Sequence, residues 1–96
     1  KIPIELSFQS RFGPASWLRP YTDKTLERLA KEGKKNILII CPGFSSDCVE
    51  TLEEIEMEGQ ETFREHGGEK FSMVPCLNDS NDHINLLEYL IKKHIV

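Results

Sequence analysis

The sequence predicts an α/β domain with a parallel sheet, and three features of the 96-residue chain lead to that class. Segments typical of strands and of helices alternate three times, as in βα units that are joined by right-handed crossovers. Residues 36–41 are a continuous apolar run, which is typical of a strand covered on both faces. A helix rich in acidic residues is predicted directly after that run. We therefore expect an α/β domain that consists of three βα units.

The first βα unit begins with residues 2–8, which alternate loosely between apolar and polar side chains and predict a strand. Thr22 or Asp23 then caps a helix that extends to residue 32, and Gly33 ends that helix. Because the strand begins abruptly at the start of the chain, we expect a piece that was cut from a larger protein.

The second unit joins the apolar strand at residues 36–41 to a helix over residues 48–66. Gly67 and Gly68 end this helix, because glycine suits the position that follows a last helical turn. The side of the helix that is expected to face the core is thin and consists of Leu52, Ile55 and Phe63.

The third unit begins with a short strand at residues 70–74, which Pro75 ends. An amphipathic helix follows, capped by Asn81 or Asp82. The apolar face of this last helix consists of Ile84, Leu87, Leu90 and Ile91.

Two loops leave the carboxyl ends of predicted strands, at residues 9–17 and 42–47. Ligands of parallel sheets bind beyond these strand ends, so both loops are expected to face one crevice. Trp17 suits stacking against a large, flat ligand, and Arg11 suits a ligand carboxylate. The alternatives are a hydrophobic plug over the core for Trp17 and a partly exposed structural contact for Arg11.

The predicted helix at residues 48–66 carries acidic residues at helical spacing, namely Glu50, Glu54, Glu58, Glu61 and Glu65. Asp47 suits the N-cap and Glu50 follows three residues later, which indicates a capping box. Like charges at this spacing destabilise a helix by about 0.2–0.5 kcal/mol per pair, so the row indicates a cation as its partner. Glu50, Glu54 and Glu58 predict a path for a hydrated divalent ion and for protons. A solvated helix face is the alternative.

The composition excludes several classes of function. The chain has 16 acidic and 12 basic residues, a net charge of −4 and a pI near 5.3, which argues against a nucleic-acid or anionic-membrane surface. No apolar run is long enough to span a bilayer, and no signal peptide is recognised. The sequence holds no phosphate-binding loop, nucleophile elbow or His-Glu-x-x-His zinc motif.

The three cysteines, Cys41, Cys48 and Cys76, are odd in number and far apart. They favour a reducing cytoplasm over a disulfide framework, and the absence of a Cys-x-x-Cys pair argues against zinc or a cluster. Cys48 lies beside a predicted helix N-terminus, where a thiolate is favoured. Cys41 and Cys76 are expected to be small buried residues.

None of the three histidines is predicted to lie at the crevice. His66 is near the end of the acidic helix and complements the helix dipole, whereas His83 and His94 are expected at the surface. A general base therefore has to come from other residues.

Two segments of the chain resemble the ferrochelatase family. Residues 7–23, SFQSRFGPASWLRPYTD, are similar to its Gln-Ser-x-x-Gly…Trp-Leu-x-Pro-x-Thr-Asp segment. Residues 41–54, CPGFSSDCVETLEE, are similar to its active-site signature, most closely in proteobacterial members. The resemblance covers nearly the whole chain, in order and at the family's spacing. It implies the C-terminal part of an enzyme that inserts ferrous iron into protoporphyrin IX, releases two protons and gives protohaem.

The resemblance also implies that the chain is a three-layer chelatase-like half-domain with a parallel sheet, incomplete at three βα units, and it implies a site. The family has two similar α/β halves, each with a four-stranded parallel sheet, and porphyrin binds in the cleft between them. By matching motif, Glu50 is the acid at the porphyrin centre, in proton removal or metal delivery, and Asp47 supports it. Glu54 and Glu58 continue the acidic row, on a helix that contains a π-turn in the family. Trp17 belongs to the porphyrin pocket.

The chain also departs from the family pattern. The family's essential histidine lies upstream of Lys1, on a strand that separates the strands predicted at residues 2–8 and 36–41. The N-terminal half, which supplies much of the porphyrin pocket, is absent too. We therefore expect an exposed sheet edge, through which the piece can self-associate. Many members have His in place of Cys48 and Tyr in place of Glu53. The piece alone is expected to be inactive, because it lacks walls that position the porphyrin and the base.

By this resemblance iron is a substrate, no resident cofactor is expected, and the [2Fe–2S]-binding cysteines of animal members have no counterpart. The expected partners are protoporphyrin IX, ferrous iron and the missing N-terminal half, with peripheral membrane contact of the full-length enzyme as a further option. The expected location is the cytoplasm.

Two alternative functions stay open. One is a related cobalt or nickel chelatase of tetrapyrrole synthesis. The Trp17 loop and the Asp-Cys-Val-Glu-Thr-Leu string favour iron over this alternative, because those chelatases have metal-binding histidines instead. The other is a non-catalytic acidic module that binds divalent cations or a protein.

Overall fold

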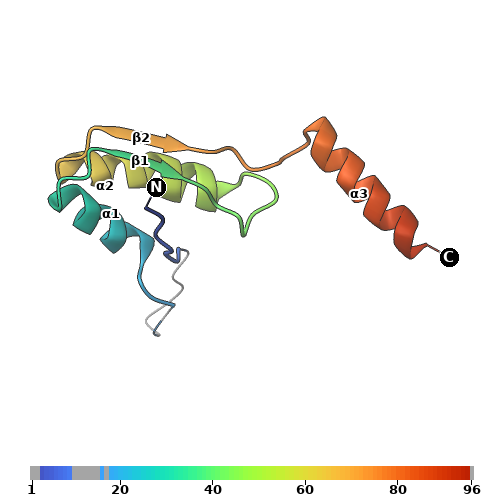
Figure 1. Ribbon diagram of the computed structural model, residues 1–96, viewed down its shortest axis with the longest axis horizontal. Helices are drawn as coiled ribbons and strands as arrows, with labels where there is room; N and C mark the ends of the chain where they lie inside the picture. Colours follow the sequence, from blue (N-terminus) through green and yellow to red (C-terminus); the bar gives the residue numbers. More distant parts are fainter. Residues whose placement is uncertain (1–2, 10–15, 17, 96) are drawn as a thin grey trace.

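A computed structural model describes residues 3–9, 16 and 18–95 of the chain, and its centre is a two-stranded parallel sheet (Figure 1). Strand β1 (Asn36–Ile39) pairs in register with β2 (Lys70–Met73), so that Asn36 lies opposite Lys70 and Ile39 opposite Met73. The strands are separated in sequence by a helix, as a βαβ crossover requires. The parallel α/β class predicted from the sequence is confirmed.

Four helical elements complete the described chain: α1 (Thr22–Lys31), η1 (Glu50–Gly59), α2 (Gln60–Glu65) and α3 (Asn81–His94). Element η1 is a π-helix, whose backbone hydrogen bonds span five residues instead of four. It continues without a break into α2, so the predicted helix at residues 48–66 is one rod with two kinds of winding. The π-turn that the resemblance implied is therefore present and is ten residues long.

The core lies between the rod formed by η1 and α2, helix α1 and strand β2. Phe63 of α2 is completely buried and contacts Phe71 of β2, with ring centroids 6.4 Å apart and ring planes inclined by 52°. Leu26 of α1 and Ile55 of η1 are buried beside them. Burying a large apolar side chain contributes about 1.5–3 kcal/mol, so these residues are expected to hold the rod against the sheet. Leu52 was predicted on this side but is exposed, because the wider π-winding turns it away.

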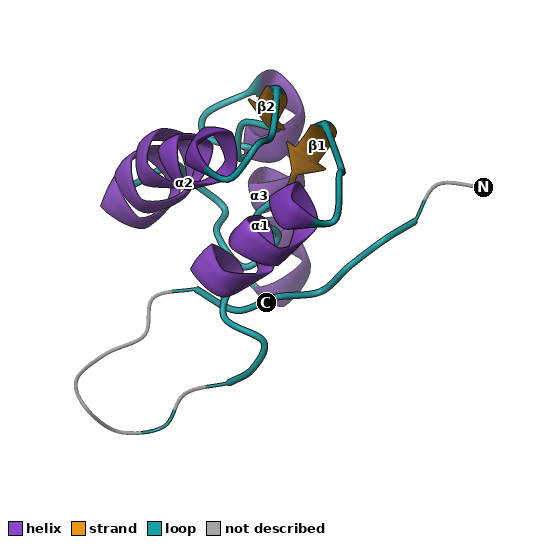
Figure 2. Cartoon of the chain, turned by 90° about the vertical axis from the view of Figure 1, so that its left-hand side faces the viewer, coloured by secondary structure: helices purple, strands orange, loops and turns teal. Residues whose placement is uncertain are grey.

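The described helices cover only one face of the sheet (Figures 1 and 2). Ile37 and Ile39 of β1 are half-buried, whereas Leu38 is 69% exposed and Ile40, just after the strand, is 65% exposed. The prediction that this apolar run is covered on both faces is wrong for the described chain. The described residues supply the sheet and one helical layer of the predicted three layers.

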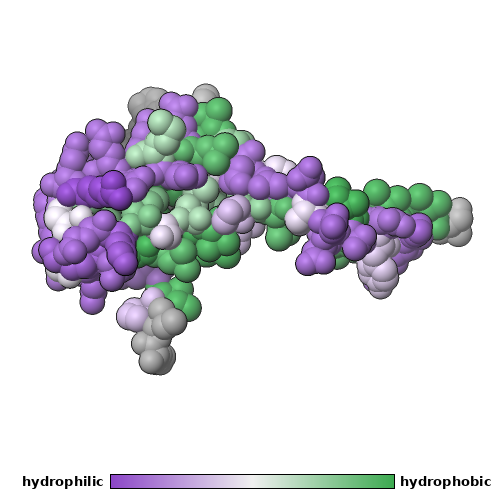
Figure 3. All heavy atoms as spheres, turned by 90° about the horizontal axis from the view of Figure 1, so that it is seen from above, coloured by the Kyte–Doolittle hydropathy of each residue, from purple (hydrophilic) through white to green (hydrophobic). Residues whose placement is uncertain are grey.

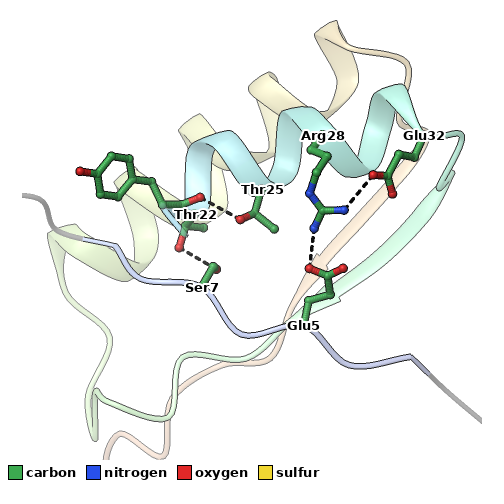
Figure 4. Close-up of polar contacts among 7 residues, drawn as sticks. Glu5, Ser7, Thr22, Thr25, Arg28 and Glu32 are labelled. Carbon is green, nitrogen blue, oxygen red and sulfur yellow. Dashed lines mark hydrogen bonds and ion pairs between the residues drawn. The ribbon is translucent and has the colours of Figure 1, made fainter. Parts of the chain in front are cut away.

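The strand predicted at residues 2–8 is not formed by its described part. Residues 3–7 have no regular structure, and Phe8 makes a single parallel bridge with Tyr21. A strand needs a neighbour for its backbone groups, and this segment lies along helix α1 instead. The Arg28 guanidinium contacts the Glu5 carboxylate at 2.5 Å, and the Ser7 and Thr22 hydroxyl groups are 2.9 Å apart (Figure 4).

The ends of two helices differ from the predicted caps. Tyr21 precedes α1 at the N-cap position, where Thr22 or Asp23 was predicted, and its side chain forms no capping hydrogen bond. Ser80 caps α3 by accepting a hydrogen bond from the His83 amide at 3.3 Å, where Asn81 or Asp82 was predicted. Serine is as good a cap as these residues, so the pattern left the exact position open.

Helix α3 extends away from the rest of the described chain and does not pack along another helix or strand (Figure 1). The radius of gyration is accordingly 16.2 Å, against about 13 Å for a compact domain of 100 residues. Apolar side chains run along one side of α3 and polar ones along the other (Figure 3). Among the described residues, no helix is long and apolar enough to cross a membrane.

Candidate functional site

The centre of the candidate site is Asp47, in the loop that follows β1. Its Oδ1 accepts a hydrogen bond from the Thr51 hydroxyl at 2.9 Å. Its Oδ2 accepts from the Asn78 side-chain amide at 2.9 Å and from the Cys76 backbone amide at 3.2 Å. The Asp47 backbone amide donates to Asn78 Oδ1 at 2.7 Å. Asp47 therefore joins the start of η1 to the loop between β2 and α3.

These hydrogen bonds favour the ionised form of Asp47, and they contradict its predicted role as the N-cap of the helix. The bonds with the Asn78 amide and the Thr51 hydroxyl hold the pKa of the Asp47 carboxyl below its usual value, because they stabilise the ionised form. No side chain caps η1, whose N-cap residue is Val49. Asp47 and Glu50 therefore form no capping box, since within the first turn the Asp47 carboxylate binds the Thr51 hydroxyl instead of a backbone amide of that turn.

Glu50 is the first residue of η1 and is half-buried. Its backbone carbonyl accepts a hydrogen bond from Gln9 Nε2 at 2.9 Å, and the Cys41 thiol donates to Gln9 Oε1 at 3.7 Å. A hydrogen bond with the Cys48 side chain is the main cause that lowers the pKa of the Glu50 carboxyl. The carboxyl is therefore ionised at neutral pH, which is the form that attracts a cation and accepts a proton.

Glu54 and Glu58 lie together at an open depression of about 540 Å³ between η1 and α1. Its lining also includes the apolar residues Leu26 and Ile55 and the charged residues Asp23 and Lys24 of α1. Glu54 is half-buried, whereas Glu58 is exposed. The two acids, which are four residues apart in the sequence, thus line one hollow.

The rest of the acidic row is arranged differently. Glu50 does not line the depression, and Glu61 and Glu65 are exposed on α2. Within the part of the chain that the structure describes, no group of three or more His, Cys, Asp or Glu side chains is placed to hold a metal ion. The row is spread along the helix and does not form a closed cage.

All three cysteines are free, and two of them have thiols with raised pKa values. Burial is the first cause that raises the pKa of the Cys41 thiol. Burial together with a hydrogen bond to Asp47 raises the pKa of Cys76 to about 11. Cys41 is buried as predicted, whereas the prediction that Cys76 is buried is wrong, because Cys76 is only half-buried in the loop after β2. The predicted thiolate character of Cys48 stays a prediction.

The three histidines lie in different surroundings. His83 is buried, so its prediction as a surface residue is wrong. Its Nδ1 forms a hydrogen bond with the Asn78 backbone carbonyl, which shields the ring at the start of α3. His66 is half-buried, with Nδ1 2.8 Å from the Thr62 carbonyl and Nε2 3.7 Å from Glu27. His94 is exposed at the end of α3, as predicted.

Two predicted porphyrin contacts, Arg11 and Trp17, lie outside the described residues. The sequence did not indicate Thr51 and Asn78 as site residues, although their side chains each donate a hydrogen bond to one carboxylate oxygen of Asp47. Asn78 has a positive φ of 51°, and asparagine in a short polar turn is the usual signal for such a backbone. The sequence thus indicated the turn around Asn78 but gave no sign of its partner 31 residues away.

Comparison with known proteins gives one consistent result. The family model described as Ferrochelatase matches residues 1–95. The ferrochelatase of Allorhizobium ampelinum is 57% identical over 95 residues, which are 99% of this chain and 28% of that protein. The ferrochelatase of Rhizobium etli is 56% identical, over 94% of this chain and 26% of its own length. That of Rhizobium meliloti is 54% identical, over 96% and 27%. The chain therefore spans about a quarter of the length of these relatives.

Proposed function

Because the chain belongs to the ferrochelatase family, we propose that it is part of an enzyme that inserts ferrous iron into protoporphyrin IX, releases two protons and gives protohaem. The observation that carries the proposal is the position of the acids. An ionised Glu50 begins the π-helix, and Glu54 and Glu58 follow along the same rod at an open depression. Carboxylates suit both halves of the reaction, since they bind a hard cation and accept protons.

Each acid has a separate role in this proposal. Glu50 accepts a pyrrole proton or passes the metal to the ring centre, and its half-buried position strengthens its electrostatic effect on either charge. Glu54 and Glu58 lead a hydrated cation toward it. A row of single carboxylates favours transfer over retention, because a tightly closed site would hold the ion. Asp47 acts as a positioning residue, because its oxygens bind Thr51, Cys76 and Asn78.

The other expectations about the enzyme belong to the same proposal. Trp17 and Arg11 contribute to the porphyrin pocket, and the iron is substrate, so that no resident cofactor or iron–sulfur cluster is needed. Two free thiols with raised pKa values and a third free cysteine suit a reducing cytoplasm. The exposed Leu38 and Ile40 support the expectation that a further part of the protein is needed to complete the half-domain.

The role of Glu50 is tested by Glu50→Gln in the full-length enzyme, which keeps the size of the side chain and removes its charge. We expect iron insertion to fall by about 100-fold or more, the usual scale for a lost acid–base group, while porphyrin binding measured by fluorescence quenching stays. Glu53→Gln is the matched control, because Glu53 is exposed on the same helix, and it should keep wild-type activity.

Three results would contradict these assignments in different ways. Wild-type insertion rates in Glu50→Gln would remove Glu50 from the reaction. Absence of both insertion and porphyrin binding in the full-length wild type would favour the non-catalytic acidic module. Iron or zinc insertion by the 96-residue chain alone would overturn the expectation that this piece is inactive.

A further inference from the structure

Asn78 is held in the loop between β2 and α3 by hydrogen bonds on both sides of its side chain. Its Nδ2 donates to Asp47 Oδ2 at 2.9 Å, and its Oδ1 accepts from the Asp47 backbone amide at 2.7 Å. Its own backbone amide donates to the Ser45 carbonyl at 2.8 Å. The Asn78 backbone carbonyl accepts from His83 Nδ1, so the residue bridges the loop after β1 and the start of α3.

The chemistry of this position suits asparagine and few other residues. Asp47 presents one acceptor and one donor to Asn78, and a carboxamide matches both at once. An ionised aspartate would supply acceptors only and would set a second negative charge against Asp47. The backbone φ of 51° at Asn78 is tolerated by Asn, Asp and Gly but strains most other residues.

A short chain of contacts leads from Asn78 to the turn that carries Glu50. The second oxygen of Asp47 accepts from the Thr51 hydroxyl at 2.9 Å, and Thr51 is 0% exposed. The Thr51 hydroxyl oxygen also accepts from the Cys48 backbone amide at 2.9 Å. Glu50 lies between Cys48 and Thr51 in the sequence. The Thr51 hydroxyl binds both Asp47 and the Cys48 amide, so the turn that carries Glu50 is connected to Asp47.

We propose that Asn78 is a positioning residue for metal insertion, which holds Asp47 in the orientation that sets Glu50 at the start of the π-helix. This inference rests on the proposed function. It assigns to the β2–α3 loop a part in the reaction, although Asn78 of that loop is 28 residues beyond Glu50 in the sequence. Asn78 acts only through other residues and touches no reacting atom.

The test compares three variants in the full-length enzyme. Asn78→Asp keeps the size and backbone preference of the side chain but removes its donor, and Asn78→Gly keeps the backbone preference and removes the amide altogether. Asn81→Asp is the matched control, because it makes the same chemical change three residues later at an exposed position. Thermal unfolding of each variant is measured alongside kcat and KM for protoporphyrin IX.

We expect both Asn78 variants to lower kcat by about 10- to 100-fold, the scale of a misplaced catalytic group, with KM for porphyrin changed less than about threefold. The introduced carboxyl in Asn78→Asp should bind a proton more easily beside the Asp47 carboxylate, and a protonated carboxyl regains a donor. The kcat deficit of Asn78→Asp should therefore be smaller at about pH 6 than at about pH 8. The deficit of Asn78→Gly should not change with pH.

A purely structural role would lower stability without the pH-dependent recovery, and that result would overturn the inference. So would wild-type kcat in either Asn78 variant, or an equal effect of Asn81→Asp. If Asn78→Asp does not fold, Asn78→Gly tests the inference, since its kcat should fall while its melting temperature stays unchanged. An inactive wild type would refute the proposed function, whereas an active wild type with active Asn78 variants would refute only this inference.

Discussion

Two amphipathic helices of this chain follow parallel strands, and they have different environments. The rod formed by η1 and α2 follows β1 and packs against β2 and α1 with Ile55 and Phe63 buried. Helix α3 follows β2, and His83 is its one buried residue among those described. The apolar residues of α3 remain exposed, including Ile84, Leu87, Leu90 and Ile91.

The difference teaches that an amphipathic pattern predicts a helix and its apolar face but not the partner of that face. The rod has few apolar residues, yet it approaches the sheet closely. Phe63 of the rod contacts Phe71 of β2, and Gly59 has no side chain to keep the rod away. A side chain at Gly59 would lie 3.2 Å from Leu26 and 3.3 Å from Phe71. Helix α3 has a broader apolar face, but the short connection after β2 directs it away from the core (Figure 1). A large exposed apolar face usually marks a contact surface.

The strongest test of this comparison is Ile55→Ala in the rod, which is matched by Ile91→Ala in α3. Ile55 of η1 is 2% exposed, and Ile55→Ala should lower the free energy of unfolding by about 2–5 kcal/mol, because it leaves a cavity in the core. Urea unfolding followed by circular dichroism measures the loss. A change below about 0.5 kcal/mol would mean that the rod does not pack as described.

The close approach at the end of the rod is tested by Gly68→Ala. A Cβ at Gly68 would lie 2.2 Å from the Phe63 ring, so the ring or the backbone has to move. We expect a loss of about 1–3 kcal/mol, as in other overpacked cores. Gly43→Ala serves as the control, since a Cβ at Gly43 meets no atom within 4 Å. Equal stability of the two variants would contradict the packing.

A third prediction concerns Asp47, which connects the start of the rod to the loop before α3. Its lowered pKa means that the folded state binds this proton less readily than the unfolded chain. The stability it contributes is present above its unfolded pKa, which is about 3.9, and is lost as the pH falls through the folded value. Asp47→Asn should therefore lose less stability than the wild type on acidification below about pH 4, measured by unfolding at several pH values. Asp79→Asn, at an exposed position in the same loop, should keep the wild-type acid sensitivity.

The smallest effect is expected in α3. Ile91 is 58% exposed, and Ile91→Ala should change the free energy of unfolding by less than about 0.5 kcal/mol, against the large loss for Ile55→Ala. The two substitutions are chemically identical, so burial alone distinguishes them. If Ile91→Ala costs several kcal/mol in the full-length protein, the apolar face of α3 is covered there, and the contrast between the two helices holds only for the described chain.

The parallel sheet, the order of the elements from α1 onward and the family were accessible from the sequence alone, whereas the strand predicted at residues 2–8 is not formed by its described part. Hydrophobic periodicity and glycine stops are local properties, and the motif at residues 41–54 is a contiguous string. The four-residue spacing of Glu54 and Glu58 likewise sufficed to bring both to one side of the rod.

Only the tertiary structure decided which contacts those elements make. Residues 2–8 have the alternation of a strand, but residues 3–7 lie along α1, because no neighbouring strand among the described residues takes up their backbone hydrogen bonds. Asp47 has the spacing of a helix cap, yet Asn78 and Thr51 take its oxygens. The physical reason is that one-dimensional patterns encode the propensity of each segment, whereas a hydrogen-bond partner 31 residues away depends on how the segments are brought together in space.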